Sequence, residues 1–450
     1  MKLTQEYKTQ CIYIFMGLII LLFPFLPAYF FMLAFFCAAL FTSRIRPGTP
    51  SFQMLARKSD IGQGRLKGLT YLFLIIGSLF LISSIVGPSK FPIFIIGGAL
   101  AITTFGDGVS DIINIYERKK SSEKVYSAKS SLVFLICGVI FSYLACAWIL
   151  AWKGQIIPEE LIFFLAVIGA VTGALLESIT YNEDNIVIPF GSAMSMWLFF
   201  TFSYGYLVER MYLLQVIIFA FVLGYLAYRM RIADISAMLS ATLLGIVIII
   251  STDVWWYLML LAFFLLGGLF TRYKYDFKKA HGIAESKGGV RGYKNVFSNS
   301  LAALVLAVAF KVFPTHSMLL LPAYLGSIAT ATGDTLASEI GQTWKGEPRM
   351  ITTLKKVKAG TDGGVTVLGE FAAFAGSGAI ALLSLRFIEN DVSLSLALIV
   401  LAGGFIGTNI DSVLGATLQQ KGYLSNNGVN LFATISGAII TALIYSSLGS

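Results

Sequence analysis

The sequence predicts an all-α, polytopic integral membrane protein with about 15 transmembrane helices in two parallel repeated halves. Hydrophobic residues make up 57% of the 450 residues and charged residues only 13%, against about 25% charged residues in a typical soluble domain. The mean hydropathy is +0.79. We expect two membrane domains, residues 1–210 and 211–450.

Each expected span is an apolar run near the length that crosses the hydrocarbon core of a bilayer. Prolines at positions 24 and 27 place a tight hairpin between the first two runs. The expected spans are residues 11–23, 27–42, 68–86, 91–105, 131–152, 158–179, 186–205, 213–228, 235–250, 254–271, 299–313, 318–333, 364–385, 394–409 and 428–448.

The positions of the basic residues predict the orientation of these spans. If the N-terminus is cytoplasmic and the spans alternate, then of the 33 Lys and Arg only Lys90, Lys153, Arg210 and Arg386 face outside, and Lys311 lies within a span. Cytoplasmic loops of membrane proteins carry such an excess of cations. We therefore expect a multi-pass protein of the cell membrane, with its polar loops cytoplasmic. The net charge of +9 then needs no nucleic-acid partner.

The four cysteines all lie in apolar runs and show no CxxC or Cys/His spacing. This pattern predicts neither disulfides nor a zinc site.

A polar stretch follows the run at 318–333 and contains Asp334, Thr335, Ser338 and Glu339. Carboxylates at the end of a membrane span are costly and are retained mainly where they bind an ion, a substrate or a partner charge. Residues 351–364 then combine hydroxyls, cations (Lys355 and Lys358 among them) and the sequence Gly360-Thr361-Asp362-Gly363-Gly364. We interpret this segment as a phosphate cradle, although the GxxxxGK[ST] motif is absent.

The first half carries a weaker version of this pattern. Asp107 ends a run, and Asp111 lies one helical turn further on, so both could reach one metal ion. Lys129-Ser130 closes the following basic loop. The simpler alternatives are a solvated acid at a helix end for Asp107 and membrane anchoring for Lys129.

Glu177 ends the run at 158–179, and Asp184-Asn185 opens the next run, with Pro189 close behind. A broken helix start exposes N–H groups that can hold an anion. A plain acidic hairpin is the alternative.

The two halves share an order of parts that predicts a parallel internal repeat. A basic glycine-bearing loop, with Arg65 and Lys67 in one half and Arg291 in the other, precedes each acidic motif. Asp107 precedes Asp184 by as many residues as Asp334 precedes Asp411. Asn409 and Asp411 lie near the end of a run, and Asn426, Asn427 and Asn430 open the last one.

These motifs resemble two known families. Residues 212–450 resemble the phytyl-phosphate kinase family of integral membrane proteins through residues 287–292, 333–341, 351–353, 360–364 and 409–416. Residues 1–205 resemble the phytol kinase and dolichol kinase family through Gly106-Asp107, Lys129-Ser130, Glu177-Ser178, Asp184-Asn185 and Pro189. The resemblance implies that an isoprenoid alcohol is phosphorylated to a monophosphate and then to a diphosphate. It implies a nucleoside triphosphate donor, CTP in the best-known cases or else ATP, with Mg²⁺.

The resemblance, with the residue chemistry, gives each site residue an expected role. The expected metal ligands are Asp107, Asp111, Asp334 and Asp411. The residues expected to act in catalysis are Asp107, Lys129, Glu177, Asp184, Asp334, Glu339, Lys358 and Asp411. The residues expected to bind nucleotide or phosphate are Arg65, Lys67, Ser130, Asn185, Arg291, Thr335, Ser338, Lys355, Gly360, Thr361, Gly363, Gly364 and Asn409.

Two alternatives remain open from the sequence. A CTP-dependent cytidylyltransferase would use the same residues to transfer a nucleotidyl group to a lipid phosphate. A lipid-phosphate transporter would share the repeats and the polar residues within the membrane. Acids, lysines and glycines clustered at one membrane face favour the kinase over the transporter.

Overall fold

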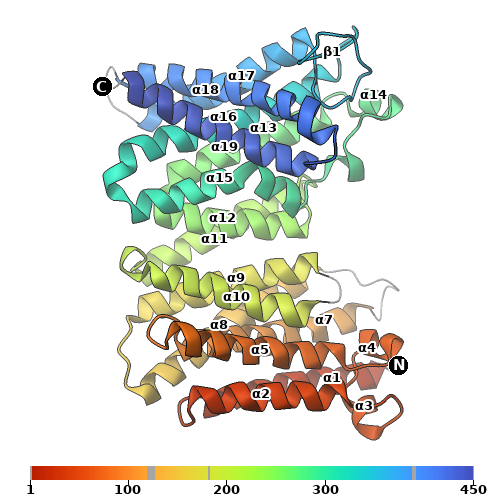
Figure 1. Cartoon of the computed structure of the whole chain (residues 1–450), viewed down its shortest axis with the longest axis vertical. Coiled ribbons are helices and arrows are strands. Elements are labelled where there is room, and N and C mark those ends of the chain that lie inside the picture. Colours follow the sequence, from red (N-terminus) through yellow and green to blue (C-terminus); the bar gives the residue numbers. More distant parts are fainter. Residues whose placement is uncertain (1–2, 119–126, 181–182, 388–391, 449–450) are drawn as a thin grey trace. The chain divides into compact units, whose positions relative to one another are not determined.

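The computed structural model describes residues 3–118, 127–180, 183–387 and 392–448, and these are almost entirely helical (Figure 1). The chain divides into two compact units, Met1–Gln215 and Val216–Ser450. Their boundary lies within helix α11 (Arg210–Arg229). Each unit is described by itself below.

The helical membrane architecture agrees with the sequence, but the expected number of about 15 spans is not confirmed. In the described part of the chain, 10 helices are long and apolar enough to cross a membrane. Two shorter apolar helices are α2 (Ala28–Ser43) and α12 (Ile235–Ser251). The run at 11–23 does not form one span, because it divides between the end of α1 (Leu3–Met16) and a 3₁₀ turn, η1 (Gly17–Leu22).

Unit 1 is a helical bundle in which one long helix carries the acidic residues. Helix α6 (Ile93–Ala101) continues through a π-helical turn, η2 (Ile102–Asp107), into α7 (Gly108–Arg118). Such turns are rare and occur frequently at functional sites. The other elements of unit 1 are α3 (Pro50–Leu55), α4 (Lys58–Gln63), α5 (Lys67–Val86), α8 (Ala128–Lys153), α9 (Glu159–Ile179), α10 (Asp184–Thr201) and η3 (Ser203–Gly205).

Unit 2 is a second helical bundle with one short hairpin. Strands β1 (Arg349–Met350) and β2 (Gly364–Val365) pair antiparallel. The helices that follow α12 are α13 (Val254–Arg272), α14 (Tyr275–Ala280), η4 (Ser286–Gly289), α15 (Tyr293–Val312), η5 (Pro314–His316), α16 (Ser317–Gly341), α17 (Val367–Ser384), η6 (Leu385–Phe387), α18 (Val392–Leu414), η7 (Gly415–Gln419) and α19 (Asn426–Leu448).

Helix α16 is the centre of unit 2, with nearly every residue after Leu321 buried or half-buried. Neighbouring helices approach it closely at glycines, as is common in membrane bundles. A Cβ atom at Gly376 of α17 would lie 2.9 Å from the carbonyl oxygen of Thr332. One at Gly404 of α18 would lie 2.5 Å from Cβ of Ala329. This close packing brings the polar ends of α16 and α18 together.

Candidate functional site

A polar cavity of about 540 Å³ lies in unit 2, where the first turns of α15, α17 and α19 meet the last turns of α16 and α18. Helix N-termini present unpaired N–H groups that favour an anion. The cavity brings together residues from four separate sequence motifs. The predicted site residues that line it are Arg291, Thr335, Ser338, Asp334, Glu339, Gly360, Thr361, Gly363, Gly364 and Asp411.

Two carboxylates meet in this cavity. The side chains of Asp334, near the end of α16, and Asp411, near the end of α18, both line it and lie close enough for their charges to interact. Two carboxylates this close must share a proton or hold a cation. Oδ2 of Asp411 is buried and has no hydrogen-bond partner among the described residues. The pair therefore suits a hard cation such as Mg²⁺, which prefers oxygen ligands.

Arg291 supplies a buried cation to the same cavity. Its backbone is fixed on both sides, because its N–H donates to the carbonyl of Ile232 (2.9 Å) and its carbonyl accepts from N of Asp234 (2.9 Å). Only 8% of the residue is exposed. Burial lowers the pKa of Arg291, and the nearby charges of Glu339 and Glu285 oppose that effect. Within the described residues, its Nη1 atom has no hydrogen-bond partner.

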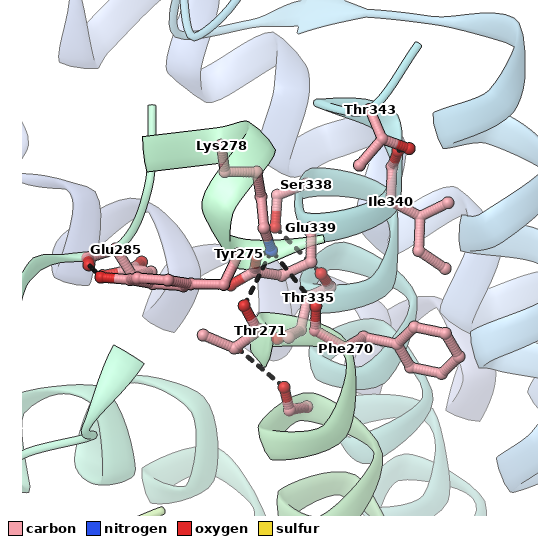
Figure 2. A network of polar contacts seen from close by, with 11 residues as sticks. Phe270, Thr271, Tyr275, Lys278, Glu285, Thr335, Ser338, Glu339, Ile340 and Thr343 are labelled. Carbon is pink, nitrogen blue, oxygen red and sulfur yellow. Dashed lines mark hydrogen bonds and ion pairs between the residues drawn. The ribbon is translucent and has the colours of Figure 1, made fainter. Parts of the chain in front are cut away.

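Glu339 forms an ion pair with a lysine that the sequence analysis did not single out. Nζ of Lys278, on the short helix α14, donates to Oε2 of Glu339 over 2.5 Å. The same Nζ donates to the carbonyl oxygens of Phe270 (3.2 Å) and Thr271 (2.8 Å) at the end of α13 (Figure 2). The lysine side chain is 1% exposed. The carboxylate of Glu339 is thus paired with the buried ammonium group of Lys278.

The glycine-rich loop lines the cavity, but its lysines do not. Gly363 has φ of 76°, and a Cβ atom there would lie 2.5 Å from the backbone N of Ala416, so only glycine fits. Lys355 and Lys358 are exposed. Neither is among the lining residues in the described part of the chain. Asn409 also lies outside the lining, where its amide donates to the carbonyl of Phe405.

Three carboxylates lie close together in unit 1, one each from η2, α7 and α9. One oxygen each from Asp107, Asp111 and Glu177 lie within 4.8 Å of one another. Oγ of Ser110 donates to Oε1 of Glu177 over 2.8 Å. The other oxygen of Glu177 is buried without a partner among the described residues. This oxygen-rich cluster suits a divalent cation.

A cation that the sequence analysis missed lies beside these acids. Nη2 of Arg57, in the link between α3 and α4, is 3.8 Å from Oδ2 of Asp107. Its guanidinium lies over the ring of Tyr13, 4.1 Å from the centroid. Burial alone would lower the pKa of Arg57, but Tyr13, Asp107 and Asp111 raise it overall. The amide of Gln10, also on α1, donates to Asp111.

Some of the other predicted residues of unit 1 lie near Arg57 or at the start of α10, and the rest lie away from the acids. Asn185 is buried near Arg57 and Tyr13: a Cβ atom at Gly68 would lie 2.8 Å from Nδ2 of Asn185 and 3.8 Å from Cδ of Arg57. Asp184 accepts a hydrogen bond from Oγ1 of Thr180 (3.0 Å). The remaining residues are outside the acidic cluster: Arg65, Lys67 and Lys129 are exposed, and Oγ of Ser130 accepts a hydrogen bond from N of Ser127, the N-cap residue of α8.

The expected equivalence of Asp184 with Asp411 is wrong at the level of the helices. Asp184 begins α10, whereas Asp411 lies in the last turn of α18. Glu177, like Asp411, lies in the last turn of the second long helix after the acidic motif of its half. The start of α10 corresponds instead to the start of α19, with Asn426 and Asn427, which line the cavity.

The cavity contains further polar residues that the sequence analysis did not select. A charge or amide near a helix start is the only signal that marks them, and many exposed residues share it. They include Asp234, Glu285, Lys294, Asn295 and Glu370.

Comparison with known proteins identifies the second unit. Residues 218–438 match the family described as integral membrane protein DUF92. An uncharacterized membrane protein of Methanocaldococcus jannaschii is 35% identical over 227 residues, covering 50% of this chain and 92% of that protein. One from Synechocystis is 39% identical over 203 residues, covering 44% and 78%. The chloroplastic protein VTE6 of Arabidopsis thaliana is 29% identical over 195 residues, covering 42% and 58%.

No solved structure matches the chain. The agreement with the family and with nearly the whole length of the archaeal relative is confined to one half of the chain. Through this half, the chain belongs to the DUF92 family of integral membrane proteins.

Proposed function

We propose that the chain is a membrane isoprenoid kinase that uses a nucleoside triphosphate with Mg²⁺. Unit 2 transfers a phosphoryl group to a prenyl monophosphate, which yields the diphosphate. Unit 1 phosphorylates the prenyl alcohol to the monophosphate. The observation that carries the proposal is the carboxylate pair of Asp334 and Asp411 beside a buried arginine in one polar cavity.

The residues of unit 2 fit the needs of phosphoryl transfer, which depends on positioning and on stabilising negative charge. Asp334 and Asp411 are placed to hold Mg²⁺, which would neutralise donor phosphates when bound. Arg291 offers free N–H donors of its planar guanidinium to a phosphate. The glycine loop at 360–364 lets the backbone approach the ligand closely. An anionic phosphate acceptor needs no strong general base.

Unit 1 has the additional group that an alcohol acceptor requires. The buried Glu177 carboxylate keeps one oxygen free of partners among the described residues, and Ser110 fixes the other. We assign Glu177 to orient the attacking hydroxyl, with Asp184 as the alternative. Asp107 and Asp111 would hold the metal ion. We assign to Arg57, in place of Lys129, the positive charge that offsets the charge developing in transfer.

The substrate and the membrane explain the surroundings of the sites. We infer that the prenyl tail lies among the apolar spans and that its polar end reaches the helix ends where the acids gather. The bias of basic residues supports a cytoplasmic position for these ends in the cell membrane, where nucleotides and Mg²⁺ are available. The resemblance of the two halves to the phytol and phytyl-phosphate kinase families supports the same substrate class.

The test uses purified full-length protein in detergent with Mg²⁺ and labelled CTP or ATP. Geranylgeraniol and geranylgeranyl monophosphate are offered separately, and the products are resolved. We expect Asp107→Ala to abolish phosphorylation of the alcohol alone (the alcohol step). We expect Asp334→Ala to abolish phosphorylation of the monophosphate alone (the monophosphate step). If only the second step occurs in the wild type, unit 1 is an inactive scaffold. If neither acceptor is phosphorylated, the kinase proposal is wrong.

A further inference from the structure

Glu339 interacts with two buried cations of unit 2. Lys278 pairs with it directly, with Nζ 2.5 Å from Oε2. Arg291 lines the same cavity as Glu339, and the negative charges of Glu339 and Glu285 oppose the lowering of its pKa by burial. One carboxylate therefore has two candidate partners, and only one of them faces the cavity.

The two cations differ in whether they have hydrogen-bond donors left for a ligand. Lys278 has its three N–H donors matched by three acceptors, namely Glu339 and the carbonyls of Phe270 and Thr271 (Figure 2). It does not belong to the cavity lining. Arg291 lines the cavity, and its Nη1 atom lacks a partner among the described residues.

The position of the Arg291 guanidinium is tightly defined. It lies 5.5 Å from the ring centroid of Phe263, and a Cβ atom at Gly267 of α13 would overlap it. The backbone of Arg291 is fixed by hydrogen bonds on both sides. Packing therefore holds the guanidinium beside the cavity, and the neighbouring charges decide which partner its N–H groups serve.

We propose that Lys278 is a positioning residue. Its ion pair with Glu339 neutralises that carboxylate and so leaves Arg291 available to bind a phosphate group in the cavity. The proposal deepens the function proposed above and rests on it. If Lys278 lost its charge, Glu339 would become a buried carboxylate without a counter-charge, which is strongly unfavourable. Arg291, which lines the same cavity and interacts with the charge of Glu339, would compensate, and it would be withdrawn from the ligand. Glu339 then serves as a counter-ion and not as a metal ligand.

The experiment measures binding of inorganic pyrophosphate with Mg²⁺ to the full-length protein in detergent, by calorimetry. We expect Lys278→Met to weaken binding roughly tenfold to a hundredfold, the range of a lost charged hydrogen bond. The double variant Lys278→Met with Glu339→Gln should recover affinity to within about threefold of wild type, because the unpaired carboxylate is gone. Lys279→Met removes an exposed charge from the same helix and is the matched control.

The variants separate this role from two others. Glu339→Gln alone should bind pyrophosphate more tightly than wild type, since Arg291 loses a negative neighbour; weaker binding would make Glu339 a metal ligand and overturn the inference. Folded Lys278→Met that binds like wild type would also overturn it. So would a folded double variant that stays as weak as Lys278→Met, since Lys278 would then be purely structural. If the wild type binds no pyrophosphate, this inference fails, whereas the proposed function is still decided by phosphorylation of the two acceptors.

Discussion

Replacing Asp411 by Asn should change activity and stability in opposite directions. The substitution leaves the shape of the cavity intact but removes one of two interacting carboxylates. If the pair holds Mg²⁺ for phosphoryl transfer, we expect the diphosphate-forming rate to fall about a hundredfold or more. If the same pair is a strained feature of the metal-free protein, its removal should stabilise the fold.

The repulsion between the carboxylates of Asp334 and Asp411 sets the expected gain in the free energy of unfolding. Two unit charges 4 Å apart repel by about 4 kcal/mol at an effective dielectric constant of about 20. Sharing of a proton within the pair removes much of this repulsion, so we expect a gain of about 1–2 kcal/mol. For a unit of this size, that corresponds to a rise in Tm of roughly 2–8 °C.

Thermal unfolding in EDTA, followed in detergent, measures this rise. Mg²⁺ should raise the Tm of the wild type and have less effect on Asp411→Asn. Asp276→Asn, which removes an exposed carboxylate from α14, is the control and should change neither property. A lower Tm in EDTA for Asp411→Asn, or full activity, would refute the reasoning.

Three further predictions concern the surrounding residues. Arg57→Gln should slow the alcohol step tenfold or more, as expected for loss of a charge-assisted contact, and spare the monophosphate step; equal losses in both acceptor assays would contradict the assignment. Gly363→Ala should cost about 1–2 kcal/mol in left-handed backbone strain alone, so both the Tm and the monophosphate step should fall. Gly267→Ala should displace Arg291 and weaken pyrophosphate binding in calorimetry, whereas Gly378→Ala, with only ordinary contacts, should not.

The helical membrane fold follows from hydropathy, but the number of spans does not. An apolar run predicts burial and cannot distinguish lipid from protein as the surrounding medium. Helix α16 illustrates this, because most of its length is buried. It is long enough to cross a membrane, but its many small and polar residues make it less apolar than the ten candidate spans. Short runs such as 11–23 end in turns that only tertiary packing determines.

The acids of the site could be predicted because carboxylates near membrane spans are rare and need a reason. Asp107, Asp111 and Glu177 indeed lie together, and Asp334 meets Asp411. The cations could not be chosen in the same way. Lysines are abundant in loops for topological reasons, so sequence cannot distinguish a buried lysine from an exposed one.

The same limit explains why Lys355 and Lys358 are exposed while Lys278 is buried. Lys278 and Lys279 are adjacent and chemically identical, and only the packing of α14 against the ends of α13 and α16 distinguishes them. The equal sequence separations of Asp107 from Asp184 and of Asp334 from Asp411 do not reflect equal positions in helices, because Asp184 begins a helix and Asp411 lies at the end of one.

The fate of two labels tests the central claim most directly. The full-length protein receives geranylgeranyl monophosphate with Mg²⁺ and CTP labelled in either the γ- or the α-phosphate, with Asp334→Ala alongside and ATP in parallel. A kinase transfers only the γ label to the lipid, releases the nucleoside diphosphate, and loses this transfer in Asp334→Ala. Transfer of the α label with release of pyrophosphate would identify a cytidylyltransferase and contradict the account, as would an unlabelled lipid with both nucleotides.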